Sequence, residues 1–290
     1  MNEFASFLIT FRETLEMALI VGIILAYLVK INKPEYHKTV YVGVGAGIIA
    51  SVITAIAFNS IAGGFTGAAE QFFEAVTMLF GAFLITVMIV WLMRWRNVAN
   101  NLRQKVKEEV SREHRIGLFL LVFFSIFREG VETVIFLGTA GFTAGGYSLI
   151  GSIGGIALAV FLGFLLFVEM VKIDLRKVFL ATSILLVFFA AGLVAHSVHE
   201  FQEAKALAIG TEEAWNINPP MNPDGTYPLL HEDGTIGSIA KGLFGYNGNP
   251  SLLEVLSYAA YLGIICAIVT FNIKIKPKSS KIPAENRIGK

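Results

Sequence analysis

The sequence predicts an all-α integral membrane protein with seven transmembrane helices. Hydrophobic residues make up 55% of the chain, charged residues make up only 16%, and the mean hydropathy is +0.66. This composition lies outside the range of soluble domains. The apolar residues also gather in stretches of at least about 20 residues, the length that a helix needs to cross a bilayer.

Seven apolar stretches account for most of the chain. They are separated by short polar or glycine-bearing connections and cover residues 4–29, 39–62, 70–93, 116–139, 148–171, 178–199 and 252–273. The first stretch is too long for the core of a signal peptide, lacks a basic leader and carries charges, so we expect it to be a retained span. The prediction is a single transmembrane domain over residues 1–273 followed by a basic tail over 274–290, with no soluble domain.

The basic residues of the connections predict the orientation of the chain. Those after the first, third and fifth stretches, and the tail, are rich in lysine and arginine, whereas residues 61–69 and 140–147 contain none. The long connection 201–249 contains only Lys205 and Lys241. Because basic loops stay on the cytoplasmic side, we expect the N-terminus outside and the C-terminus in the cytoplasm. Residues 94–115 are expected to form an amphipathic cytoplasmic helix.

A charged motif, R-E-x-x-E, occurs in two of the stretches. It comprises Arg12, Glu13 and Glu16 in the first stretch, and Arg128, Glu129 and Glu132 in the fourth. An odd number of crossings separates the copies, so they run through the bilayer in opposite directions. This arrangement predicts two inverted repeats, 4–93 and 116–199, followed by an outer loop at 201–249 and a seventh span at 252–273.

Glycines follow each copy of the motif at the start of the next span. Gly43, Gly45 and Gly47 follow the first copy, and Gly151, Gly154 and Gly155 follow the second. Both sets contain a small-xxx-small spacing, which predicts close contact between helices within one chain or between chains.

The motif residues lie near mid-span, where each charge costs at least about 2.5 to 3.5 kcal/mol. On a helix, the arginine reaches the glutamate four residues later. A purely structural role, in which such ion pairs only help the helices to associate, would therefore explain Glu16 and Glu132. Such pairs leave Glu13 and Glu129 unpaired, which favours a site for a cation. Carboxylates suit hard cations, and a single cysteine, Cys266, with no mid-span histidine argues against a thiolate or imidazole site.

Two other classes of protein remain open on these residues. Paired glutamates also hold di-iron centres in membrane-embedded enzymes, although those sites usually include a Glu-x-x-His spacing that is missing here. A channel or carrier for another cation, such as manganese or lead, or a proton-driven carrier is the other alternative, because carboxylates discriminate poorly among cations. No nucleotide-binding or cofactor motif is present, so we expect no cofactor and no nucleic-acid partner.

Further acidic residues and two histidines lie at the predicted outer ends of the spans. Glu70 and Glu74 share a helix face at the start of the third span, and Glu254 opens the seventh. The end of the sixth span contributes His196, His199, Glu200 and Glu203. Together these groups could capture a metal ion before it moves inward; for each one, the alternative is a solvated helix end.

Several segments resemble the oxidase-dependent iron transporters, namely the fungal high-affinity iron permeases and especially the bacterial EfeU-type permeases. The resemblance rests on "RETLE", "REGVE", "EQFFE", "AAGLVAHSVHEFQEA" and "GLFGYNGNPSLLEV" and covers nearly the whole chain. The chain departs from the family at Thr14, where a glycine is usual. The outer segment "NPPMNPDGTYPLLHEDG" also looks longer than expected.

The resemblance implies a permease, not an enzyme, that moves iron as Fe²⁺ or Fe³⁺ through the cell membrane. In the family the motif glutamates carry the ion, which maps here onto Glu13, Glu16, Glu129 and Glu132. Arg12 and Arg128 would then hold the carboxylates apart and ionised when no ion is present. An extracytoplasmic iron-oxidising or iron-binding protein is the expected partner, and a homo-oligomer is compatible with the glycine spacings.

Overall fold

The computed structural model describes residues 3–92, 98–111, 114–144, 146–167, 175–222 and 226–274, and its regular elements there are all helical. In chain order these elements are α1 (Glu3–Lys30), η1 (Pro34–Tyr36), α2 (His37–Ala62), α3 (Ala68–Leu92), α4 (Val98–Ser111), α5 (Arg115–Ala144), α6 (Leu149–Phe167), α7 (Leu175–Glu203), α8 (Thr235–Phe244) and α9 (Leu252–Lys274). The long helices therefore overlap all seven predicted spans. The predicted ends at Met93 and Val171 lie outside the described residues.

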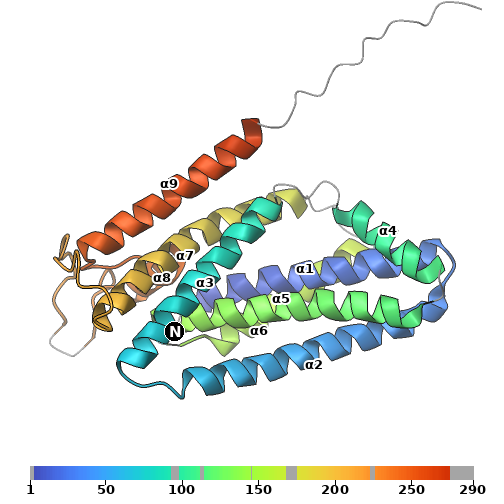
Figure 1. Cartoon of the computed structure of the whole chain (residues 1–290), viewed down its shortest axis with the longest axis horizontal. Helices are drawn as coiled ribbons and strands as arrows, with labels where there is room; N and C mark the ends of the chain where they lie inside the picture. The colour runs from blue at the N-terminus through green and yellow to red at the C-terminus, as the bar shows by residue number, and fades with distance from the viewer. Residues whose placement is uncertain are drawn as a thin grey trace, which may run out of the picture.

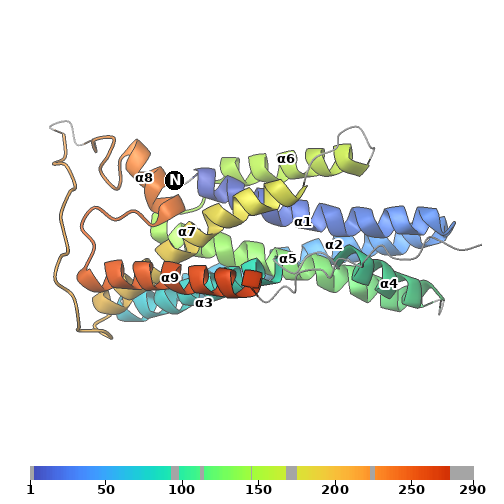
Figure 2. The same ribbon diagram turned by 90° about the horizontal axis from the view of Figure 1, so that it is seen from above.

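The long helices run between the same two ends of a bundle, and consecutive ones alternate in direction (Figures 1 and 2). One end holds the start of α1, the turn between α2 and α3, and α8; we call it the α8 end. The other holds η1 and α4, and we call it the α4 end. In Figure 1, α3 and α7 run obliquely to α1 and α5, and α9 lies against α7 on the side away from them.

Among the described residues, five helices are long and apolar enough to span a membrane. They cover Pro34–Ala62, Ala68–Val90, Leu149–Phe167, Lys177–Glu203 and Leu252–Phe271. The other two long helices, α1 and α5, contain 28 and 30 residues, but each carries the three charges of its motif. The helices α5 and α7 extend beyond the predicted spans, so Glu200 and Glu203 are still part of a helix.

The glycines of α6 allow close contact with α1. A Cβ atom at Gly151 would lie 2.2 Å from the carbonyl oxygen of Glu3, and one at Gly155 would lie 2.4 Å from that of Phe7. Thr10 adds a polar contact by donating a hydrogen bond of 3.0 Å to the carbonyl oxygen of Ser152. The prediction of close contact is confirmed for this pair of helices, within one chain.

The glycines of α2 approach α5 in the corresponding way. A Cβ atom at Gly43 would lie 3.2 Å from the carbonyl oxygen of Phe119, and one at Gly47 the same distance from that of Phe123. Gly45, by contrast, faces open space. Of the three predicted contact glycines in α2, two therefore carry the contact.

The helix α4 packs against α1 and α5 at the α4 end of the bundle. Its amphipathic character is as predicted: Val106 and Val110 are buried with Ile24 of α1 and Leu118 of α5 in one apolar cluster, while most of its polar residues are exposed. Arg115 lies over the ring of Tyr36 at 5.9 Å, within the range of a cation–π contact. The flanking residues 93–97 and 112–113 lie outside the described part of the chain.

The helix α8 corrects the prediction that residues 201–249 form a loop. It packs against α7 and also touches α1 and α5. Gly245 ends it in the left-handed conformation, with φ = 68°, and a Cβ atom at Gly192 of α7 would lie 2.6 Å from the Gly245 Cα atom. This backbone-to-backbone contact seats α8 on α7 and leaves no room for a side chain at either position.

Glu232 anchors the segment that carries α8. Its carboxylate accepts a hydrogen bond of 3.0 Å from the Gly248 backbone N–H. Burial alone would raise the pKa of Glu232, but the Gly248 N–H, the charge of Lys241 and the Asn218 side chain together outweigh burial and lower the pKa below its ordinary value. The ionised carboxylate therefore stabilises the segment at neutral pH.

We expect Gly155→Ala to destabilise the protein by about 1 to 3 kcal/mol, because the added methyl group meets the backbone of α1. Gly45→Ala is the matched control and should be neutral or slightly stabilising, since its methyl group meets nothing. Thermal unfolding in detergent measures both. Equal melting temperatures for the two variants would contradict the close contact between α6 and α1.

We also expect the segment around α8 to loosen in acid. Because the pKa of Glu232 is lower in the folded state, its stabilisation is present above the unfolded pKa of about 4.3 and is lost as the pH falls through the folded pKa. Amide hydrogen exchange of residues 226–248, corrected for intrinsic rates, should accelerate between pH 6 and pH 3 in the parent and already be fast at pH 6 in Glu232→Gln. Solvent screening keeps the effect below about 1 kcal/mol. Glu212→Gln, at an exposed glutamate of the same segment, should match the parent at both pH values.

Candidate metal centre

The two R-E-x-x-E motifs meet where α1 and α5 pack together in the centre of the bundle. Carboxylate oxygens of Glu13, Glu16 and Glu129 lie within 4.8 Å of one another, and all three residues are buried. Helical spacing explains the arrangement, because residues three apart lie on the same face and the antiparallel partner presents its own motif to that face.

Each arginine binds both glutamates of its own motif. Arg12 donates a hydrogen bond of 2.5 Å to Glu13 and a second one to Glu16. Arg128 donates two hydrogen bonds to Glu129 and forms an ion pair with Glu132 at 3.5 Å. The expectation that Glu13 and Glu129 lack an arginine partner is therefore wrong, because the five donors of a guanidinium group reach an adjacent residue as well as the one four positions away.

These ion pairs still leave polar atoms unused in the centre of the site. Among the described residues, Glu13 Oε2, Glu129 Oε2 and Arg12 Nε are buried without a hydrogen-bond partner. An unsatisfied buried carboxylate oxygen costs free energy, and a metal cation would remove that cost. Glu13 and Glu129 thus each direct one oxygen to an arginine, and the other oxygen has no hydrogen-bond partner among the described residues.

The two copies of the motif differ in exposure. The side chain of Arg12 is 1% exposed, whereas that of Arg128 is 54% exposed. Glu132 is 18% exposed and lies outside the group of three carboxylates. The prediction that all four glutamates converge on one buried spot therefore needs a correction: three converge, and Glu132 lies at an open edge beside Arg128.

The chemistry of this centre suits a hard or borderline cation. Within the described ranges, the set of at least three potential ligands that lie close enough together to hold one ion consists of Glu13, Glu16 and Glu129. All of its ligand atoms are carboxylate oxygens, which favour cations such as Mg²⁺, Ca²⁺ and Mn²⁺ over those that need thiolate or imidazole. Guanidinium groups at both sides balance part of the carboxylate charge.

A hydrogen-bonded network occupies the α8 end of α7. His199 bridges Glu203 and Glu254, with distances of 3.1 Å from Nε2 and Nδ1 to the two carboxylates. Glu203 also accepts a hydrogen bond of 2.7 Å from Gln71 of α3, and Glu254 accepts one of 2.9 Å from Asn247. Two of the predicted outer ligands, Glu203 and Glu254, are therefore joined by His199.

The other predicted outer residues are more dispersed. Glu74 lies within range of the charges of Glu70, Glu200 and Glu203, which makes this end of α3 and α7 strongly acidic. His196 is buried instead, and its Nδ1 atom has no hydrogen-bond partner among the described residues. Within the part of the chain that the structure describes, these side chains form an acidic surface and not a compact ligand set.

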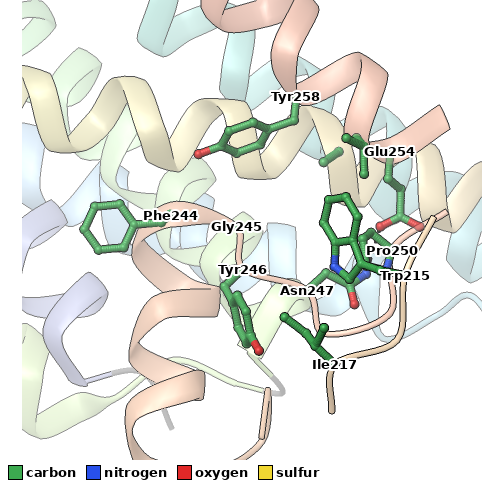
Figure 3. Close-up of a pocket in the computed structure, with 11 residues that line it drawn as sticks. Trp215, Ile217, Phe244, Gly245, Tyr246, Asn247, Pro250, Glu254 and Tyr258 are labelled. Atoms are coloured by element: carbon green, nitrogen blue, oxygen red, sulfur yellow. Dashed lines mark hydrogen bonds between the residues drawn. The ribbon is translucent and has the colours of Figure 1, made fainter. Parts of the chain in front are cut away.

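A cavity of about 360 Å³ lies beside this network, between α7, α8, α9 and the segment that follows α7 (Figure 3). Trp215, Phe244, Tyr246 and Tyr258 contribute most of its aromatic lining. The carboxylate of Glu254 is at one side in Figure 3, where Asn247 already binds it. Its mostly apolar lining cannot replace the hydration shell of a metal ion, so we do not place an ion path through it.

Comparison with known proteins connects this centre to a family. The sequence matches the model of the iron permease FTR1 family over residues 3–281. It is 33% identical over 273 residues to the ferrous iron permease EfeU of Escherichia coli O157:H7, covering 92% of this chain and 95% of the relative. The ferrous iron permease EfeU of Yersinia pseudotuberculosis is 31% identical over 277 residues, covering 93% and 92%. An uncharacterized protein of Archaeoglobus fulgidus is 30% identical over 273 residues, covering 90% and 92%. No solved structure matches the chain.

Proposed function

The chain belongs to the iron permease FTR1 family, and on that premise we propose that iron crosses the membrane through the carboxylates of Glu13, Glu16, Glu129 and Glu132. It is a multi-pass membrane protein that transports iron, and its family places it among transporters rather than enzymes. The observation that carries the proposed route is the group of three buried carboxylates contributed by two different helices.

The proposed topology has seven spans, with the α8 end outside and the α4 end in the cytoplasm. The alternating directions of the long helices support it, and so does the distribution of charge: the connections at the α4 end contain most of the lysines and arginines. On this topology α1 and α5 are spans despite their charges, because other helices surround their motifs.

Inverted repeats are supported by contacts that recur at equivalent positions. Gly151 lies over Glu3, and Gly43 lies over Phe119; Glu3 and Phe119 each precede the arginine of their motif by the same number of residues. Gly155 lies over Phe7 and Gly47 lies over Phe123, and these two phenylalanines also precede their motif arginines by equal numbers of residues. The first helix of each repeat thus packs against the second helix of the other. We propose that the two repeats form one permease domain around the carboxylates.

The charge of the centre supports Fe²⁺ as the transported form. Four carboxylates and two guanidinium groups leave two negative charges when all are ionised, and one divalent ion neutralises them. A trivalent ion would leave an excess positive charge where charge is expensive. The relatives described as ferrous iron permeases agree with this choice.

Arg12 and Arg128 act in this proposal as substitutes for the ion. In the structure each bridges the two glutamates of its own helix, which offsets part of the carboxylate charge when no metal is bound. An arriving cation would compete for the same oxygens. A bound divalent cation would offset the two negative charges that the guanidinium groups leave uncompensated, so binding lowers the net charge within the membrane.

The acidic surface at the α8 end supports a capture step before the ion reaches the centre. Glu70, Glu74 and Glu200 attract cations there, while His199 joins Glu203 to Glu254 beside them. The segment between α7 and α9 exposes Ile209, Ile217 and Leu230, and an extracytoplasmic iron-oxidising or iron-binding protein could bind at these side chains. Adding such a protein to liposomes that contain the permease should raise uptake if this partner exists.

We expect Glu129→Gln to lower iron uptake at least about tenfold, which is a typical loss on removing a group around a metal. The fold should survive, because Arg128 keeps its ion pair with Glu132. Uptake of radioactive iron into liposomes that contain only this protein measures the effect, with Fe²⁺ under reductant and chelated Fe³⁺ offered separately.

The matched control is Glu108→Gln, at an exposed glutamate of α4. It should transport iron like the parent, with Fe²⁺ taken up in preference to Fe³⁺ and to competing Mn²⁺. Normal uptake by a well-folded Glu129→Gln variant would refute the assignment of the site. Preference for Mn²⁺ would show that another cation is the substrate.

We expect Glu74→Gln to act on capture and leave the later steps unchanged. Loss of one charge at the α8 end should raise the KM for iron by roughly threefold to tenfold at low ionic strength, with kcat retained. Added salt should shrink the difference. Glu213→Gln, an exposed glutamate elsewhere at the same end, serves as control, and an equal rise in KM for both variants would argue against a specific capture surface.

A further inference from the structure

The two repeats are covered unequally around the motif, and this difference identifies the conformational state. We propose that the structure is the state in which the metal centre opens toward the α4 end, with Arg128 at the mouth of the exit, while α7 and α8 seal it at the α8 end. The inference rests on the proposed iron transport. It goes further by assigning the two arginines to opposite sides of the centre.

The arginines lie on opposite sides because α1 and α5 run in opposite directions. Arg12 precedes its glutamates on a helix that starts at the α8 end, so it lies on the α8 side of the centre. Arg128 precedes its glutamates on a helix that starts at the α4 end and therefore lies on the α4 side. The side chain of Arg12 is 1% exposed and that of Arg128 is 54% exposed, so the motif is the more accessible on its α4 side.

The unequal cover continues along both helices. Ile9 is 2% exposed and belongs to a core cluster with Leu186 and Phe189 of α7. Ser125 holds the equivalent place in the second repeat, since both residues stand three positions before the motif arginine, and it is only partly buried. Its neighbour Phe124 is 60% exposed. The turn before Arg12 is therefore covered by side chains of α7, and the equivalent turn before Arg128 is only partly covered.

The seal at the α8 end depends on α8. Leu243 of α8 lies beside Ala5, Leu8 and Ile9 of α1, together with residues of α7, around a small gap. The contact between Gly192 and Gly245 fixes the height at which α8 sits on α7. Because both glycines approach through their backbones, a single methyl group at Gly245 is enough to lift α8 from its seat.

The repeats also suggest how the opposite state is built. A short amphipathic helix follows the third long helix of each repeat: α4 follows α3, and α8 follows α7. In this structure α8 lies close to the motif of α1, while α4 packs against the far ends of α1 and α5 around Val106 and Val110. In the opposite state we expect α3 and α4 to cover Arg128 and Ser125, and Arg12 to become accessible at the α8 end.

The experiment measures the accessibility of single cysteines to a charged, membrane-impermeant thiol reagent. The native cysteine is first removed by Cys266→Ser, and Ser125→Cys or Ile9→Cys is then introduced into the full chain. Membrane vesicles of both orientations present either face to the reagent. Ala5→Cys, at a small buried residue of α1, replaces Ile9→Cys if that variant fails to fold.

We expect Ser125→Cys to react from the face that carries the α4 end, at least about tenfold faster than Ile9→Cys reacts from either face. Adding Gly245→Ala to Ile9→Cys should raise its labelling from the opposite face by a similar factor. Gly45→Ala, whose methyl group meets nothing, is the matched control and should leave the labelling unchanged.

Three results would overturn the inference: no labelling of Ser125→Cys from the α4 face, equal labelling of Ser125→Cys and Ile9→Cys, or no effect of Gly245→Ala. The first would mean that Arg128 faces lipid or a second copy of the chain. Iron uptake by the same cysteine variants separates this inference from the proposed function. The predicted labelling without any uptake would contradict iron transport alone, and uptake with the wrong labelling would contradict the gating alone.

Discussion

Six ionisable side chains near the middle of α1 and α5 are the constraint around which the bundle is organised. Charges at this depth cannot face lipid cheaply, so the two motif helices must be surrounded by others or face water. Arg12 and Arg128 compensate the glutamates of their own motifs, which satisfies each helix separately. The remaining oxygens of Glu13 and Glu129 have no partner among the described residues, and we propose that this incomplete compensation allows the centre to bind a cation.

Close packing brings the two motifs together. Without a hydrophobic driving force between helices in lipid, association depends on van der Waals contact, and glycine lets backbones approach. Gly151 and Gly155 hold α6 against α1, while Gly43 and Gly47 hold α2 against α5. In the proposed inverted repeats, each of these pairs joins one repeat to the other, which places the carboxylates at an interface between repeats. Movement of one repeat against the other can then change access to the ion without rebuilding either helix.

Much of this arrangement could be predicted from the sequence, because membrane helices leave strong signals in apolar length, loop charge and motif spacing. The ion pairs of Glu13 with Arg12 and of Glu129 with Arg128 were missed, because helical spacing describes where residues lie and not how far a guanidinium group reaches. The helix α8 was also missed: ten residues within a polar segment are too few for a span, although "IGSIAKGLFG" places Ile236, Ile239 and Leu243 at helical spacing and ends in glycine. The two motifs share one sequence pattern, so they cannot predict that Arg12 is buried while Arg128 is exposed. In our proposal that difference reflects the conformational state of the protein.

The central claim is that motif carboxylates from both repeats hold one iron ion. X-ray absorption spectroscopy of iron bound to the purified permease tests this claim most directly, because it reports the elements that coordinate the metal. The account predicts one tightly bound iron per chain with oxygen ligands only, and loss of that ion when Glu13→Gln and Glu129→Gln are combined. A nitrogen ligand from histidine, or unchanged binding in the combined variant, would place the iron elsewhere and contradict the account.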